Sequence, residues 1–206
     1  EARAFVGRME GLGARLLKLS FGAGPDLEDA VLTAAIARAH KAGMVVTAHA
    51  LGADGADRAA GLGVDLLSHT PVAALSAEQA ARWSGRAVVS TLGAFGGSDA
   101  AVANLRALRA AGATVLYGTD LGNTRRARID EVEVALLTQA GLSGAEILRS
   151  MTAAPAAFWG LEGLGTIEEG ARASLILLAA DPREDPSTLA APRAVWIDGL
   201  RADDGS

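Results

Sequence analysis

The stretch VVTAHALGADGADRAAGLGVDLLSHT, from Val45 to Thr70, contains two apolar runs of strand length, and each run stops at a histidine. His49 ends the first run and His69 the second, in a chain that has only three histidines. Between the runs lies a segment long enough for a helix. A strand, a helix and a second strand in this order predict a parallel pair, and the working groups of parallel α/β proteins gather at the carboxyl ends of the strands.

The same alternation continues on both sides of this stretch. Predicted strands cover residues 15–20, 43–49, 64–69, 86–91 and 113–120. Helical patterns lie between them, including residues 99–112 and 129–141, and the clearest has one apolar face formed by Leu27, Val31, Leu32, Ala35, Ile36 and Ala39. Continuously apolar strands that alternate with helices predict an α/β fold with a parallel sheet.

Helix boundaries carry their own signals. We expect Asp26 to cap the helix with the clearest apolar face and Gly43 to end it. Ser76 and Ser143 are each followed three residues later by Gln or Glu, which predicts two capping boxes. After about residue 161 the sequence pattern changes to short β-rich runs separated by Gly, Pro and acidic turns. This pattern indicates a small β appendage over residues 162–206.

Composition restricts the function. The chain has 206 residues, of which 50% are hydrophobic, and a formal net charge of -5 with no basic stripe, so we expect neither nucleic acid nor a membrane as a partner. Cysteine is absent, so any metal must be held by nitrogen and oxygen ligands. No signal segment is present; we expect a cytoplasmic location unless an upstream targeting segment has been lost.

The predicted strand ends carry Lys18, His49, His69, Thr91 and Asp120. Imidazole and carboxylate groups from separate strands suit zinc or another first-row divalent ion. These residues also have ordinary structural interpretations. His49 or His69 could be hydrogen-bonded at the rim of the core, Asp120 could be a turn residue, and the Lys18 stem could lie along apolar surface. Two histidines in matching positions favour the site.

Other patterns are weaker. The sequence KLSFGAGPDLEDA has the strand, G-x-G and helix start of a dinucleotide-binding fingerprint, but Leu27 replaces the third glycine. No G-x-S-x-G elbow is present. His40 falls in the last turn of a helix, where a cation is favoured, so we interpret it as structural. The basic loop NTRRAR after Asp120 is interpreted as a solvated face, with a substrate carboxylate as the alternative.

Nearly the whole chain resembles the amidohydrolase superfamily, and more closely its imidazolonepropionase-like and prolidase-like branch. The resemblance rests on AHKAGMVVTAHA, GLGVDLLSHT, GATVLYGTD and, most specifically, on VALLTQAGLSGAEILRSMTAAPAAFWGLEGLGTIEEGARASLILLAADP. It implies the last five strands of a distorted TIM-like (β/α) barrel over residues 1–161, followed by part of a β-sandwich over 162–206.

The resemblance also implies roles for single residues. His49 and His69 would be metal ligands from the fifth and sixth barrel strands, and Lys18 would be the fourth-strand lysine that many members carboxylate. A buried Lys18 amine would then become an anionic ligand. Asp120, the eighth-strand acid, would orient water and move its proton, with His69 as a second catalytic residue. The implied activity is metal-dependent hydrolysis of carbon–nitrogen bonds in a small-molecule substrate, with one or two ions, zinc foremost.

Two features depart from the family pattern. The H-x-H pair of the first strand is absent, together with the first three strands, so we expect a C-terminal fragment. An inactive fragment is one alternative, because the retained ligands lack their two first-strand partners. Ser174 stands where relatives usually have aspartate, far from the site. Two alternatives stay open: a non-catalytic α/β module or remnant that pairs with a partner chain or a second copy through open sheet edges, and a nucleotide-binding domain that uses GAG.

Overall fold

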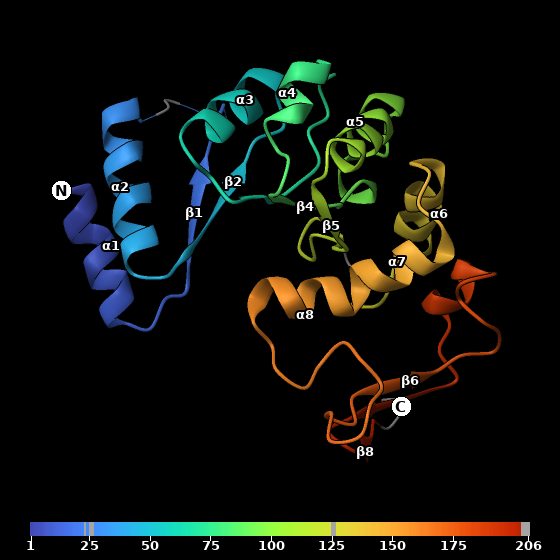
Figure 1. Ribbon diagram of the computed structural model, residues 1–206. Helices are drawn as coiled ribbons and strands as arrows, with labels where there is room; N and C mark the ends of the chain where they lie inside the picture. Colours follow the sequence, from blue (N-terminus) through green and yellow to red (C-terminus); the bar gives the residue numbers. More distant parts are fainter. Residues whose placement is uncertain (23, 25–26, 125–126, 203–206) are drawn as a thin grey trace. The chain divides into compact units, whose positions relative to one another are not determined.

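The computed structural model describes residues 1–22, 24, 27–124 and 127–202, over which helices and strands alternate (Figure 1). The elements, with η for a 3-10 helix, are α1 (Ala2–Gly11), β1 (Leu16–Ser20), α2 (Asp29–Lys41), β2 (Val45–His49), α3 (Ala53–Gly61), β3 (Leu66–Leu67), α4 (Ala77–Ala81), β4 (Ala87–Val89), η1 (Gly93–Phe95), α5 (Asp99–Ala110), β5 (Thr114–Leu116), α6 (Glu131–Gln139), α7 (Gly144–Met151), α8 (Ala153–Trp159), β6 (Leu175–Leu177), η2 (Pro186–Ala190), β7 (Ala194–Ile197) and β8 (Leu200–Arg201).

The predicted α/β fold is confirmed. Five strands form one sheet in the order β1-β2-β3-β4-β5, and the first four pair in parallel. Each of the five predicted strand segments contains one of these strands. The structure differs at β3, which pairs with β2 only through Leu66 and Leu67, whereas the apolar pattern predicts a strand over residues 64–69.

The contacts divide the described chain into two compact units. The first contains residues 1–90 and 98–114, and the second contains residues 91–97 and 115–206. The expected boundary between a barrel portion ending at residue 161 and an appendage starting at 162 is a separate question and stays a prediction.

In the first unit, α1 and α2 pack side by side along one face of the sheet (Figure 1). The predicted apolar face of α2 is buried at Leu32, Ala35, Ile36 and Ala39, but Val31 is 37% exposed and Leu27, which precedes the helix, is 56% exposed. Gly43 follows the helix with φ +68°, as a terminating glycine should. Asp26, the expected cap, lies outside the described residues, and α2 begins after Glu28.

Both predicted capping boxes are present. The Ser76 hydroxyl accepts a hydrogen bond from the Gln79 backbone N–H at 3.1 Å, and the Gln79 side chain accepts from the Ser76 N–H at 2.9 Å. Ser143 and Glu146 make the same reciprocal pair at the start of α7. These local signals place the starts of α4 and α7 without help from distant contacts.

In the second unit, the predicted β appendage forms a small antiparallel sheet in the order β6-β7-β8. Asp198 and Gly199 connect β7 to β8 with positive φ values of +51° and +82°, which is the backbone of a two-residue hairpin turn. Arg172 donates two hydrogen bonds to the Asp198 carboxylate, and Ser174 donates one to the same carboxylate. Ser174 thus helps to hold the hairpin turn.

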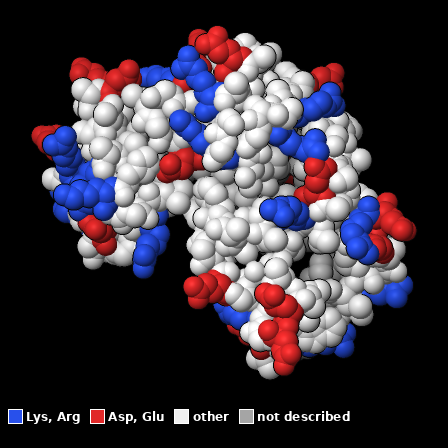
Figure 2. All heavy atoms as spheres, in the orientation of Figure 1, with Lys and Arg blue, Asp and Glu red and all other residues white. Residues whose placement is uncertain are grey.

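Charge is mixed on the surface. On the face drawn in Figure 2, Lys and Arg side chains lie among Asp and Glu side chains. Within the part of the chain that the structure describes, no helix combines the length and the apolar character needed to cross a bilayer.

Candidate functional site

His49 and His69 lie together beyond the carboxyl ends of two neighbouring strands. His49 is the last residue of β2, and His69 comes two residues after β3. Their ring centroids are 5.0 Å apart and their planes cross at 77°, so one ring presents its edge to the other. His69 is buried, with 4% of its surface exposed. The matching positions of the two residues in sequence thus correspond to contact in space.

Polar side chains next to the two histidines in sequence are hydrogen-bonded. The Thr47 hydroxyl donates to the Leu66 carbonyl at 3.1 Å and lies 2.7 Å from the Ser68 hydroxyl. Thr70 donates through its hydroxyl to the Ser90 carbonyl at 2.9 Å. Buried hydroxyls need such partners, because an unsatisfied polar group in the core costs about 1–3 kcal/mol. This end of the sheet therefore combines two imidazoles with a hydrogen-bonded polar lining.

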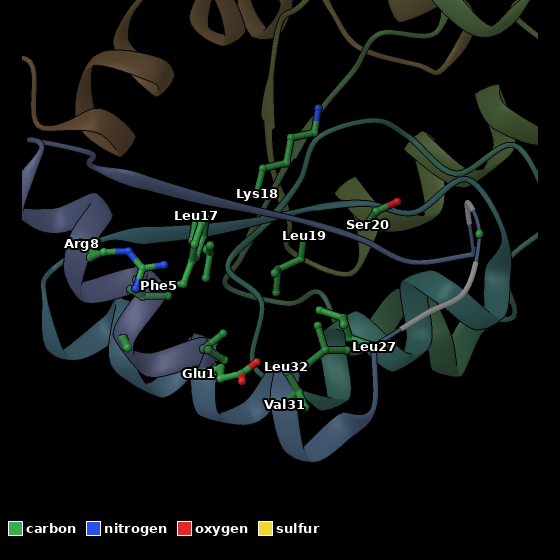
Figure 3. Close-up of a pocket in the computed structure, with 15 residues that line it drawn as sticks. Glu1, Phe5, Arg8, Leu17, Lys18, Leu19, Ser20, Leu27, Val31 and Leu32 are labelled. Atoms are coloured by element: carbon green, nitrogen blue, oxygen red, sulfur yellow. The ribbon is translucent and has the colours of Figure 1, made fainter.

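Lys18 shares a sheet face with His49. Lys18 pairs with Thr47 in the β1–β2 register, and His49 is two residues further along β2, so both side chains project to the same side. Figure 3 shows Lys18 on the opposite side of β1 from Leu17 and Leu19. The expectation of a buried amine is wrong for this chain: Lys18 is exposed, because β1 is the edge strand of the sheet.

Asp120 belongs to the second unit. It follows β5 with φ +50°, a left-handed conformation that non-glycine residues rarely adopt. Asn123 donates a hydrogen bond from Nδ2 to the Asp120 Oδ2 at 2.6 Å, and the Asn123 and Thr124 amides donate to the Asp120 carbonyl. Thr91, at the end of the fourth predicted strand, has φ +42°. The role of Asp120 stays a prediction.

His40 behaves as predicted for a structural residue. It lies in the last turn of α2, and its Nε2 is 3.0 Å from the Asp65 carboxylate, which also accepts the Val46 backbone N–H at 2.7 Å. In the basic loop NTRRAR, Arg125 and Arg126 fall outside the described residues, as do Ala23 of the GAG segment and Pro25, which follows that segment.

The histidine pair fits part of a metal site. Two imidazoles that bind one tetrahedral ion at about 2.0–2.1 Å have ring centroids about 5 Å apart. The separation of His49 and His69 matches that value at 5.0 Å. Among the described residues, no group of three or more His, Asp or Glu side chains is placed to hold an ion. The first unit therefore supplies two nitrogen donors, and further donors must come from elsewhere.

Two buried anchors were missed by sequence reasoning. Asn104 on α5 is 3% exposed and bonds the loop that follows His69, and Glu133 on α6 is 1% exposed and bonds the loop that follows β4. The signal that could have found them is a polar residue on an otherwise apolar helix face. Their partners could not be identified from sequence, because 29 to 41 positions separate each anchor from its loop.

Comparison with known proteins settles the family. The sequence pattern of the Amidohydrolase family matches residues 89–201. The chain belongs to the amidohydrolase family. Two mycobacterial relatives, the uncharacterized protein Rv2915c of Mycobacterium tuberculosis and Mb2939c of Mycobacterium bovis, are each 33% identical to this amidohydrolase over 202 residues. The match covers 85% of this chain and 52% of each relative, so the chain spans about half their length.

Solved structures share the fold of this amidohydrolase chain. A Xaa-Pro dipeptidase with bound methionine superposes with a TM-score of 0.84 at 23% identity, over 98% of this chain and 57% of the other. A prolidase from Bifidobacterium longum gives 0.79 at 24% identity, and phenylurea hydrolase B gives 0.77 at 20% identity. Each covers 98% of this chain and little more than half of the other chain. The predicted family resemblance is confirmed.

Proposed function

We propose that the protein to which this chain belongs is a metal-dependent hydrolase of carbon–nitrogen bonds in small molecules. The observation that carries the proposal is the contact between His49 and His69, at the separation expected of two imidazoles on one ion. Family membership supports it, and so do similar structures whose names include a dipeptidase and a phenylurea hydrolase.

In this proposal each residue has one task. His49 and His69 would hold the ion, and Lys18, on the same sheet face as His49, would supply a further ligand once its amine has added carbon dioxide and lost a proton to form a carbamate. When bound, a divalent ion, with zinc as the first choice, would polarise the substrate carbonyl and lower the pKa of water toward neutrality. Asp120 accepts the proton of the attacking water and delivers it to the leaving nitrogen. The small-molecule substrate enters at the carboxyl ends of the strands.

Zinc binding to this chain tests the ligand assignment. Isothermal titration with zinc compares the unchanged chain with H49A, H69A and H40A. His40 is the matched control, because it is the remaining histidine of the chain, lies in the last turn of α2 and has its Nε2 3.0 Å from the Asp65 carboxylate. We expect H49A and H69A to weaken binding at least about tenfold and H40A to leave it unchanged. Equal losses in all three variants, or no binding by the unchanged chain, would refute the assignment.

A second candidate is an α/β module that assembles with a second copy through the open edge of β1. β1 stands at the end of the strand order, beside a groove of about 820 Å³ that is lined by α1, β1 and α2 (Figure 3). Apolar groove residues are exposed: Phe5 by 47%, Leu27 by 56% and Val31 by 37%. An open strand edge beside apolar surface favours pairing between chains.

Light scattering distinguishes this candidate. It predicts an oligomer that persists in chelator and that V31E, inside the groove, dissociates. L12E is the matched control, because Leu12 is 80% exposed and does not line the groove. A folded monomer of the unchanged chain would exclude this candidate.

A further inference from the structure

The oxygen and the NH₂ group of the Asn104 side chain both form hydrogen bonds with one loop. The residue lies in the middle of α5 and is 3% exposed, beside buried Leu105 and Leu108. Its Nδ2 donates to the carbonyls of Pro71 and Ala73, each at 2.8 Å, and its Oδ1 accepts the Leu75 backbone N–H at 2.9 Å. Both amide hydrogens and the oxygen are therefore used within residues 71–75.

This loop, residues 70–75, begins directly after His69. β3 pairs with its neighbours at Leu66 and Leu67, and the Ser68 backbone N–H still donates to the Ala48 carbonyl of β2 at 2.8 Å. The backbone at His69 is therefore held by β2 on one side and by the loop on the other. Thr70 is bonded to the Ser90 carbonyl, and the next anchors along the chain are the three bonds to Asn104.

The same loop is tied to the segment that follows His49. The backbone N–H groups of Val72 and Ala73 both donate to the Leu51 carbonyl, at 2.9 and 3.2 Å. Leu51 is two residues beyond His49. The loop after one histidine is thus bonded to the segment after the other, and Asn104 fixes that loop from the helix side.

We propose that Asn104 is a positioning residue that sets the His69 imidazole against His49 through the loop 70–75. Asparagine is a poor helix former, and an apolar side chain of similar size would serve the core at least as well. Its three bonds all go to main-chain atoms of a loop attached to a site residue. The consequence for metal binding rests on the function proposed above; the consequence for the two rings does not.

The test compares N104L with L108A. N104L keeps similar bulk and removes all three bonds. L108A opens a cavity at a fully buried position on the same helix, four residues on, so it destabilises the helix packing while the three bonds of Asn104 can still form. Two quantities are measured in folded protein: the nuclear Overhauser effect between the His49 and His69 rings in metal-free protein, and the zinc dissociation constant by titration.

We expect N104L to lose most of the inter-ring effect and to weaken zinc binding about tenfold, while L108A changes each by less than about twofold. An inter-ring effect retained in N104L, or an equal loss in L108A, overturns the proposal. If N104L does not fold, N104D replaces it, because aspartate keeps an acceptor for the Leu75 N–H and cannot donate to the two carbonyls. Absence of zinc binding by the unchanged chain refutes the proposed function and leaves the ring measurement as the test of Asn104.

Discussion

Replacing Glu133 with glutamine should destabilise the protein far more than its chemical similarity suggests. The Glu133 carboxylate is 1% exposed, and its two oxygens accept the backbone N–H groups of Leu92 at 3.0 Å and Gly93 at 2.7 Å. Hydrogen bonds to a charged acceptor contribute about 1.5–3 kcal/mol each. Glutamine keeps one acceptor and turns an NH₂ group toward the other N–H.

The change therefore loses one charge-assisted bond and buries two donors that face each other. Together these effects cost about 3–5 kcal/mol, a large share of the 5–15 kcal/mol that stabilises a typical domain. Urea unfolding followed by circular dichroism measures the loss; with a slope of about 2 kcal/mol per molar, the midpoint of E133Q should fall by about 1.5–2.5 M.

The neighbouring Glu131 provides the control. Its side chain is 67% exposed and 3.9 Å from Arg128, an ion pair of the kind that contributes little. E131Q should change the free energy of unfolding by less than about 0.5 kcal/mol. If E133Q and E131Q have the same midpoint, the Glu133 carboxylate is not holding the loop as an ionised acceptor, and the reasoning fails.

Two further changes test other parts of the second unit. G144A would bring a Cβ into the carbonyl oxygens of Arg183 and Pro182, so it should lower the free energy of unfolding by about 1–3 kcal/mol. G11A is the control, because the new Cβ there meets open space, and it should not lower the free energy of unfolding. Equal unfolding midpoints for the two variants would contradict the packing of α7. The Tyr117 hydroxyl accepts the Asp130 N–H at 2.7 Å, and burial raises the pKa of Tyr117 from 10.0 to about 12. Because the pKa of Tyr117 is higher in the folded state, the contribution of Tyr117 to the free energy of unfolding is complete below pH 10 and is lost as the pH rises toward 12. Y117F should remove this alkaline loss from a plot of the free energy of unfolding against pH. An unchanged plot would show that another group is responsible.

Local patterns predicted the elements of this fold well. Apolar runs placed all five strands, and the serine starts of α4 and α7 are the capping boxes that the spacing indicates. The histidine pair was predictable because parallel strands end at one edge of a sheet, so two strand-end residues meet without any knowledge of the rest of the chain.

Properties that depend on distant partners were not predictable. Asp65, which the pattern assigns to a strand, instead precedes the two-residue β3. Lys18 was expected to be buried, and its exposure follows from the edge position of β1, which the lysine and its leucine neighbours do not encode. Asn104 and Glu133 look like ordinary polar residues in amphipathic helices until the loops that they bind are known.

The way in which Asn104 and Glu133 hold their loops has a consequence for how this amidohydrolase can evolve. Both bind only main-chain N–H and carbonyl groups of the loop in the bonds described above. The side chains of those loops can therefore be exchanged without losing the bonds to Asn104 or Glu133, provided the new residues accept the same backbone angles. The loop sequences can thus change while the main-chain bonds that hold the loops are kept.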